Sequence, residues 1–235
     1  ARVQFVGTGP GDPNLLTLGA VDAINRAQVI VISCAEHRML LGSDFLELRP
    51  DVRIVLAGDA DEEAVALPSQ PGGAPTPVDV DEHCTDLIAT VIEAASQGLE
   101  VVRLVSGDPF LDGDIGAEAA AVARADHDVD VIPGVTGMTA VPEYAGLILH
   151  GHDVQLIGDA ACQRDIAGHG PDWSDQGLIV VHTSAGKLKE VVKHAVASGR
   201  SEDEPAALIC HGATTQQITH TVTLGALPQT AKTAR

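Results

Sequence analysis

The sequence predicts an α/β protein with a mainly parallel sheet in its first half and a mixed sheet in its second half. Three observations predict this class. The opening segments follow the order strand, glycine turn, helix and strand, which is the unit from which parallel sheets are built. Hydrophobic residues make up 45% of the chain and aromatic residues only 2%, so that aliphatic side chains must fill the core. Residues 217–224 alternate between hydroxyl side chains and other, mostly apolar ones, which is typical of an antiparallel strand with one covered face.

The first repeat of strand and helix is short and well marked. Residues 3–6 form an apolar run that stops at Gly7 and predicts a buried strand. Apolar residues recur at helical spacing over residues 15–27, which predicts a helix. The β-branched run Val29–Ile32 then predicts a second buried strand.

The middle of the chain begins with a change of composition. Residues 59–81 are rich in proline, glycine and acidic residues and predict a long loop. Residues 82–97 have an apolar face at helical spacing, and Gly98 stands where a helix often ends in a left-handed residue. A strand at Val101–Val105, a helix at 116–125 and a strand at 129–132 complete the first half.

A Pro-Gly pair at 133–134 predicts a domain junction, with one α/β domain at residues 1–132 and a second at 133–235. The second domain opens with a helix at 136–145 that Pro142 interrupts. Its remaining predicted elements are strands near 154–157, 178–182, 206–210 and 217–224, with a helix at 187–197 between them. Residues 229–235 predict no element.

Charge and cysteine content exclude several classes of protein. The chain of 235 residues has 14 Lys and Arg against 33 Asp and Glu, a net charge of −19 that disfavours nucleic acid and anionic lipid as partners. The cysteines form no CxxC pair, and the sequence has neither a signal peptide nor an apolar run long enough to span a bilayer, which predicts a reduced cytoplasmic protein. Cys34 with His37, and His83 with Cys84, come nearest to metal-ligand spacing. Because zinc needs four converging ligands, we expect no metal site.

Three glycine-rich segments each follow a predicted strand, at residues 7–13, 106–110 and 133–137. The first is not a dinucleotide-binding pattern, because Asp12 stands where the third glycine belongs, and no Gly-Lys-Ser/Thr follows to make a P-loop. Open α/β sheets bind ligands at the carboxyl ends of their strands. Together the segments therefore predict a small ligand held against backbone.

These segments resemble the motifs of a known family. Residues 7–17, 107–110 and 132–136, followed by Ala140, Pro142 and residues 144–146, are similar to the three ordered motifs of the tetrapyrrole methylases, closest to the uroporphyrinogen-III C-methyltransferase branch. The resemblance implies a two-domain tetrapyrrole methylase fold with S-adenosylmethionine in a cleft between the domains. It also implies methylation of a tetrapyrrole on the way to siroheme and cobalamin, and a homodimer.

The family's functional positions can be carried over residue by residue. The resemblance implies a cofactor-binding set of Pro10, Ser106, Gly107, Asp108, Leu111, Thr136, Gly137, His182, Gly212 and Ala213. It implies that His150, His152 and Asp114 face the substrate. Since methyl transfer depends mainly on positioning a nucleophilic pyrrole carbon, no catalytic side chain is expected.

Several positions depart from the family pattern. Asp114 stands where the family has arginine, Ser33-Cys34 replaces Tyr-Asp, Val181-His182-Thr183 replaces Tyr-Met-Gly, and the segment at 211–214 lacks its arginine. Asp112 and Asp114 should weaken the binding of a polycarboxylate, since like charges in a cleft repel. Four histidines near motif ends, His150, His152, His182 and His211, could partly replace the lost cations.

Three functions remain open on the sequence. The first is an S-adenosylmethionine-dependent C-methyltransferase acting on a tetrapyrrole, most simply uroporphyrinogen III. The second is a weakly active or inactive methylase-like domain that binds a cofactor or docks a partner, such as a fused or associated uroporphyrinogen-III synthase. The third is a methyltransferase with another substrate, such as a later corrin precursor or a modified protein side chain.

Overall fold

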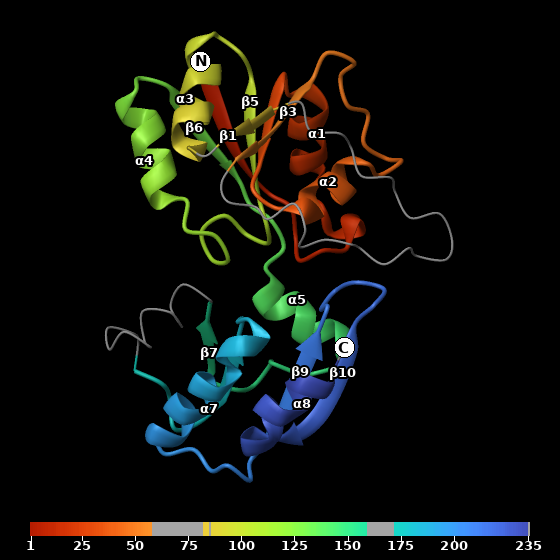
Figure 1. Cartoon of the computed structure of the whole chain (residues 1–235), viewed down its shortest axis with the longest axis vertical. Coiled ribbons are helices and arrows are strands. Elements are labelled where there is room, and N and C mark those ends of the chain that lie inside the picture. The colour runs from red at the N-terminus through yellow and green to blue at the C-terminus, as the bar shows by residue number, and fades with distance from the viewer. Residues whose placement is uncertain (58–81, 85, 159–171, 235) are drawn as a thin grey trace. The chain divides into compact units, whose positions relative to one another are not determined.

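The computed structural model describes residues 1–57, 82–84, 86–158 and 172–234. Its contacts divide the chain into two compact units, Ala1–Thr136 and Gly137–Arg235 (Figure 1). The loop expected at 59–81 lies outside the described residues. In the part of the chain that is described, no helix is long and apolar enough to cross a membrane.

The first unit contains a parallel sheet of six strands in the order β4-β3-β2-β5-β1-β6, which confirms the predicted parallel half. β1 lies between β5 and β6: Val3 of β1 aligns with Val101 of β5 on one side and with Val129 of β6 on the other. The strands are β1 (Arg2–Gly7), β2 (Val29–Ile32), β3 (Arg53–Ala57), β4 (Glu82–Cys84), β5 (Val101–Val105) and β6 (Asp128–Ile132).

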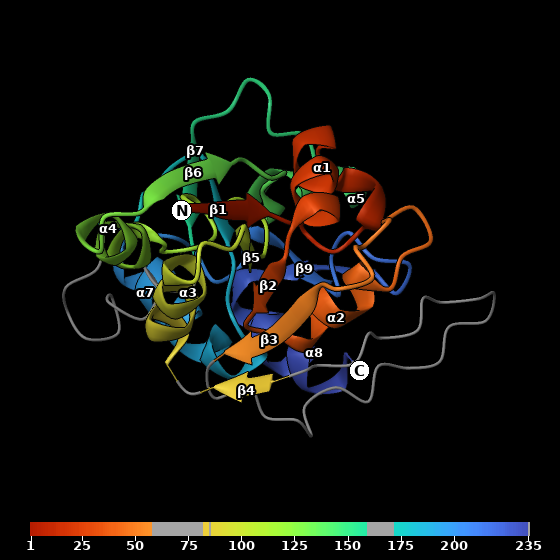
Figure 2. The ribbon, with the colours of Figure 1, turned by 90° about the horizontal axis from the view of Figure 1, so that it is seen from above.

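Helices cover both faces of this sheet, as the view in Figure 2 shows. One face packs against α3 (Leu87–Ser96) and α4 (Gly116–Arg124), through a cluster that includes Val91, Ala94 and Val122. The other face packs against α1 (Leu18–Arg26) and α2 (Ala35–Leu41), through a cluster that includes Ile24 and Leu41. The alternation of side chains along β1, β2, β3 and β5 supplies both clusters, so these four strands have a core on either face.

The predicted helix at 82–97 is wrong at its beginning. Its first three residues form the edge strand β4, which pairs with Val55–Ala57 of β3. The helix begins after Asp86, whose carboxylate accepts a hydrogen bond of 2.9 Å from the Ala89 amide and so caps α3. The helix expected at 15–27 also starts later, because Pro13–Leu15 is a 3-10 turn and Thr17 caps α1.

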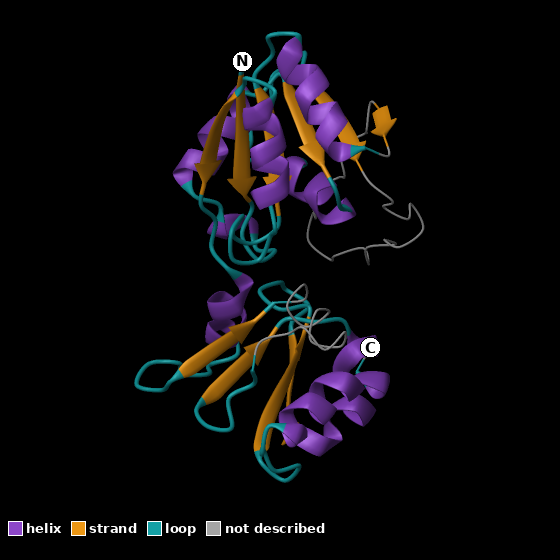
Figure 3. Cartoon of the chain, turned by 90° about the vertical axis from the view of Figure 1, so that its left-hand side faces the viewer, coloured by secondary structure: helices purple, strands orange, loops and turns teal. Residues whose placement is uncertain are grey.

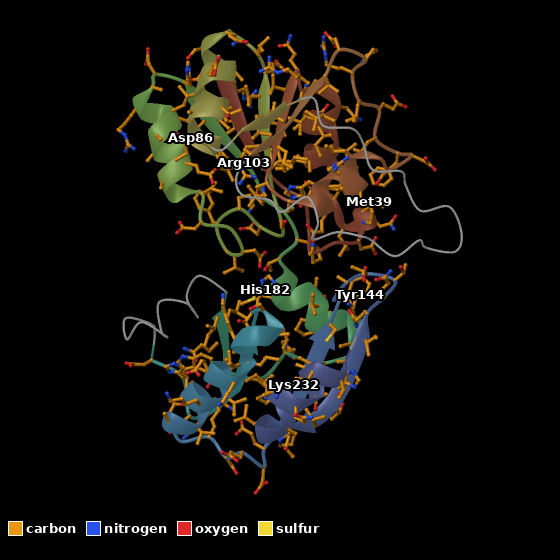
Figure 4. All side chains as sticks on the ribbon, in the orientation of Figure 1. Met39, Asp86, Arg103, Tyr144, His182 and Lys232 are labelled. Carbon is orange, nitrogen blue, oxygen red and sulfur yellow. The ribbon has the colours of Figure 1, made fainter. Side chains whose placement is uncertain are left out.

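A buried charge lies inside the parallel sheet. Arg103 of β5, labelled in Figure 4, is only 6% exposed. Its Nε atom lies 3.2 Å from Oε2 of Glu118 in α4. Its guanidinium also donates to the carbonyl of Leu104. The pairing offsets much of the cost of taking this charge out of water.

The second unit contains two small sheets of different type, which confirms the mixed half (Figure 3). β7 (Val154–Ile157) pairs in parallel with β8 (Leu178–Val181), and β9 (Pro205–Cys210) pairs antiparallel with β10 (Ile218–Thr223). The helices are α5 (Gly137–Tyr144), α7 (Leu188–Ala197) and α8 (Leu227–Thr233), with 3-10 turns at Ala185–Lys187 and Leu224–Ala226.

The end of the chain is helical, so the prediction of no element at 229–235 is wrong. α8 begins at Leu227, with a proline in its first turn, and runs to Thr233. Leu224 and Leu227 bury their side chains in the core of the second unit together with Ile157 and Val191. A helix with so few apolar residues depends on this packing rather than on its own pattern.

Candidate functional site

Two of the glycine segments are joined by backbone hydrogen bonds where β1 and β5 end. The Thr8 amide donates to the Val105 carbonyl over 2.8 Å. Gly9 and Gly107 then exchange two bonds, of 2.7 Å from the Gly107 amide and 3.2 Å from the Gly9 amide. The chain therefore continues past both strands as a short antiparallel bridge.

The third segment packs directly on this bridge. A Cβ atom on Gly134 would lie 2.1 Å from the Gly107 oxygen and 2.8 Å from the Gly7 Cα. A Cβ atom on Gly7 would in turn lie 2.5 Å from the Gly134 nitrogen. These distances are shorter than any real contact of a side chain. We refer to Gly7, Gly107 and Gly134 as the glycine junction, and it brings the three segments to one edge of the sheet.

The carboxylate of Asp108 binds backbone on both sides of the glycine junction. Its Oδ1 atom accepts from the amides of Phe110 and Leu111, at 3.0 and 3.1 Å. Its Oδ2 atom accepts from the Gly134 amide at 3.3 Å. Asp108, which the resemblance assigns to the cofactor, thus also fixes its own loop and ties it to the third segment.

Asp112 forms a second tie. Its carboxylate accepts from the Asp108 amide at 2.7 Å and from the Thr136 hydroxyl at 2.9 Å. A Cβ atom on Gly107 would lie 2.1 Å from the same carboxylate, and Gly107 has a φ of +68°. Asp112 is therefore bound within the protein, whereas Asp114, two residues further on, is exposed.

A buried histidine that the sequence did not assign to this site lies beside the glycine junction. His37, in the first turn of α2, is 2% exposed. Its Nε2 atom lies 3.2 Å from the Ser106 hydroxyl and 3.4 Å from the Thr8 hydroxyl. The Cys34 sulfur lies 3.7 Å from the same Ser106 oxygen. We call Thr8, Cys34, His37 and Ser106 the polar cluster; it lies at the carboxyl ends of β1, β2 and β5.

The polar cluster carries no charge at neutral pH. Burial, and to a smaller extent the positive charge of Arg103, lowers the pKa of His37 to about 3. Burial raises the pKa of the Cys34 thiol to about 11. The imidazole is therefore neutral and the thiol keeps its proton. Among the residues that the structure describes, no three histidine, cysteine or acidic side chains group as metal ligands.

The outer side of this edge is open and partly apolar. Ser106 is exposed, and Pro10 is half-buried. Phe110 and Leu111 are 67% and 46% exposed, which is unusual for such large apolar side chains. Backbone, one hydroxyl and two apolar side chains therefore line the edge, which is a suitable surface for a small amphipathic molecule.

In the second unit, the loop after β9 packs on α5. A Cβ atom on Gly212 would lie 2.4 Å from a methyl group of Val141. On either side of it, His211 and Ala213 adopt positive φ angles of 50° and 54°. The Ala213 amide donates to the Gln217 side chain at 2.8 Å, which holds this unusual backbone. Such conformations persist only where the surroundings enforce them, and they often mark a functional site.

His182, which the resemblance assigns to the cofactor, lies apart from His150 and His152, which it assigns to the substrate. His182 directly follows β8 and lies at the end of the second unit where α5 is found (Figure 4). His150 and His152 are exposed in the turn before β7. Because β7 and β8 are parallel, the start of one and the end of the other are separated by the strand length, about 13 Å for four residues.

Comparison with known proteins identifies the family. The family model of tetrapyrrole (corrin/porphyrin) methylases matches residues 2–228. The chain belongs to this family. A uroporphyrinogen-III C-methyltransferase of Sinorhizobium is 33% identical over 230 residues, which cover 94% of this chain and 75% of the relative. A siroheme synthase of Klebsiella pneumoniae is also 33% identical, and this match covers 99% of the chain but only 46% of the synthase.

Solved structures confirm the predicted fold class. A cobalt precorrin-4 methyltransferase has a TM-score of 0.70 at 21% identity, with 99% of this chain and 89% of that chain covered. A uroporphyrin-III C-methyltransferase from Thermus thermophilus has a TM-score of 0.67 at 22% identity, with 100% and 90% covered. The same Thermus enzyme in complex with S-adenosyl homocysteine has a TM-score of 0.63 at 23% identity, covering 98% and 87%. At this identity the likeness concerns the fold.

The glycine junction predicts a large effect from a single methyl group. Gly134→Ala should lower the free energy of unfolding by about 3 kcal/mol, because its Cβ atom would overlap the Gly107 carbonyl. Gly186→Ala is the control: its Cβ would meet nothing within 4 Å, and the free energy of unfolding should stay within about 0.5 kcal/mol of the original. Urea denaturation measures both. Equal stabilities of the two variants would contradict the close packing.

The buried imidazole predicts a dependence of stability on pH. Its folded pKa of about 3 lies below the usual 6.5, so between these values the unfolded chain binds a proton that the folded chain does not. The contribution of the His37 imidazole to the free energy of unfolding is therefore fully present above about pH 6.5. It is lost as the pH falls, by about 2 kcal/mol at about pH 5. His37→Leu should remove that loss. Urea denaturation of both proteins at about pH 7 and pH 5 tests this. An equal loss of unfolding free energy in the two proteins between these pH values would contradict it.

Proposed function

We propose that this protein is an S-adenosylmethionine-dependent methyltransferase that methylates carbon in a tetrapyrrole, most simply uroporphyrinogen III, in the synthesis of siroheme and cobalamin. The observation that carries the proposal is the glycine junction, which brings the three family motifs to one open edge of the sheet. The names of the relatives support it, since the curated proteins described above are a uroporphyrinogen-III C-methyltransferase and a siroheme synthase. The chain spans less than half of the siroheme synthases, so their other activities are not assigned to it.

The residues at this edge fit the proposed cofactor. S-adenosylmethionine supplies an electrophilic methyl group when bound. Glycine backbone allows close approach, the Ser106 hydroxyl offers a polar contact, and the exposed side chain of Leu111 offers an apolar one. We assign cofactor binding to Pro10, Ser106, Gly107, Asp108, Leu111 and Thr136 of the first unit and, as the family resemblance implies, to Gly137, His182, Gly212 and Ala213 of the second.

The proposed reaction requires the protein mainly to position its two substrates, and the uncharged polar cluster is compatible with that role. An electron-rich pyrrole carbon is itself the nucleophile, so the protein needs to align it and exclude competitors. A cysteine thiolate is a strong competing nucleophile, and only the thiolate reacts readily. Because burial raises the pKa of the Cys34 thiol to about 11, this sulfur stays protonated beside Ser106.

The two acidic residues that replace family residues near the site differ in their surroundings. Asp112 replaces a family residue, but its carboxylate is bound by the Asp108 amide and the Thr136 hydroxyl. Asp114 is the exposed carboxylate of this loop, and we propose that it faces the substrate. Both carboxylates keep their negative charge, which lowers the affinity for an anion but does not prevent binding.

Assembly and location follow the family resemblance and are part of the proposal. We propose a homodimer in the cytoplasm. Light scattering after size exclusion would give the mass of the assembly. An associated uroporphyrinogen-III synthase belongs to the alternative function, in which the chain is a docking domain with little activity.

Binding and turnover test the proposed function in sequence. We expect calorimetry to detect S-adenosyl homocysteine binding to the wild-type protein, with a dissociation constant of about 1–100 μM. We then expect methylation of uroporphyrinogen III, measured as transfer of a labelled methyl group. Lack of binding would contradict the cofactor assignment, and binding without transfer would favour the docking domain or another substrate.

Reversing the exposed charge tests the substrate assignment. Asp114→Arg should lower the KM for uroporphyrinogen III about tenfold, because it replaces a repulsion with an attraction near a carboxylate. Glu93→Arg, an exposed position in α3, makes the same change of net charge and should leave KM unchanged. Equal KM values for the two variants would show that Asp114 does not face the substrate.

A further inference from the structure

The hydrogen bonds of the polar cluster determine which nitrogen of His37 carries the proton. The Thr8 hydroxyl lies 3.2 Å from the Val105 carbonyl, and a carbonyl oxygen can only accept. The single Thr8 proton is therefore used in that bond. At the 3.4 Å contact between Thr8 and His37, Nε2 must then be the donor.

The other imidazole nitrogen agrees with this assignment. Nδ1 of His37 is buried and finds no hydrogen-bond partner among the residues that the structure describes. A neutral imidazole has one N–H, and a proton on Nδ1 would leave that N–H without a partner and leave Nε2 with no proton to donate to Thr8. The neutral form with the proton on Nε2 is therefore the favoured one, and its N–H is shared between Thr8 and Ser106.

This assignment has a consequence for Ser106. Its oxygen accepts from Nε2 at 3.2 Å, so its own proton remains to be donated. Within the cluster the other neighbour is the Cys34 sulfur at 3.7 Å, a weak acceptor. Ser106 is exposed, and an oxygen atom of a ligand on its open side would be a much stronger acceptor.

We propose that His37 is a positioning residue that acts through Ser106: its Nε2–H holds the Ser106 oxygen, so that the Ser106 hydroxyl donates its proton to an acceptor oxygen of the bound cofactor. The inference rests on the proposed function for the identity of that cofactor. His37 itself does not touch the ligand. Its imidazole stays neutral, because burial and the positive charge of Arg103 oppose the binding of a second proton. Arg103 is itself paired with Glu118.

A double-mutant cycle tests whether the two residues act as one unit. Ser106→Ala and His37→Leu should each weaken S-adenosyl homocysteine binding by about five- to tenfold, the effect of one hydrogen bond. The double variant should be no weaker than Ser106→Ala, because His37 acts only through the hydroxyl. His37→Gln, which keeps an N–H donor, should recover most of the affinity. Calorimetry measures all four.

The chain offers a matched control pair. His127 Nε2 lies 3.2 Å from the Ser96 hydroxyl, the same distance as in the His37–Ser106 pair. Ser96 ends α3, and His127 immediately precedes β6, so this pair lies at the amino end of the strands. His127→Leu and Ser96→Ala should leave the affinity for S-adenosyl homocysteine unchanged.

A spectroscopic measurement tests the proton assignment without ligand or turnover. Nitrogen-15 NMR of the histidine rings distinguishes a protonated from an unprotonated ring nitrogen, and we expect His37 to carry its proton on Nε2. The His37→Leu spectrum identifies which ring signals belong to this residue. In Ser106→Ala the proton should remain on Nε2, held by Thr8.

Three results would overturn the inference while leaving the proposed function intact. In the first, the wild-type protein binds S-adenosyl homocysteine but the losses of affinity in Ser106→Ala and His37→Leu add up in the double variant. In the second, His37→Leu binds as tightly as the wild-type protein. In the third, the His37 ring carries its proton on Nδ1. Failure of the wild-type protein to bind S-adenosyl homocysteine would instead overturn the proposed function, which removes the ligand on which the inference depends.

Discussion

The contact of three glycine backbones at the carboxyl ends of β1, β5 and β6 is the constraint on which the candidate site depends. Gly134 approaches Gly7 and Gly107 so closely that a Cβ atom on it would overlap a carbonyl oxygen. No side chain can therefore project from the junction itself, and the functional groups must come from its neighbours. Thr8, Ser106, Asp108 and Thr136 occupy those neighbouring positions, and each takes part in a hydrogen bond that crosses from one segment to another or to α2.

The same constraint changes how the charge of −19 bears on function. A carboxylate close to bare backbone amides is a useful structural acceptor, and Asp108 and Asp112 together accept from four backbone amides and one hydroxyl. These bonds hold the glycine segments together without side chains at the glycines. Hydrogen bonds from neutral amides and a hydroxyl hold these two carboxylates in place but leave their negative charges. The exposed Asp114 differs from them in that a ligand can approach its carboxylate directly.

The sequence predicted most of the sheet, because buried strands and glycine turns have strong local patterns. It missed β3, although Ile54–Ala57 is a short apolar run of the kind that predicts a buried strand. It also missed α2 and the three-residue edge strand β4, which are too short to have a clear apolar period. The site was predictable where it depended on glycines that follow strands. His37 was not, because its partners Thr8 and Ser106 lie 29 and 69 residues away. The separation of His150 from His182 was equally invisible, since it depends on the parallel pairing of β7 with β8.

A buried arginine in a parallel sheet looks costly, yet it has a role in keeping the site uncharged. Arg103 lies on β5, three residues before Ser106, and Glu118 pairs with it from α4. Its charge, added to burial, opposes protonation and lowers the pKa of His37 to about 3. An imidazolium there would carry a proton on both nitrogens and place a positive charge near any cationic sulfonium bound at the edge, where like charges repel. The neutral imidazole avoids that repulsion and still provides the N–H that fixes Ser106. The ion pair inside the sheet therefore contributes to the electrostatics of the edge as well as to the packing of β5 against α4.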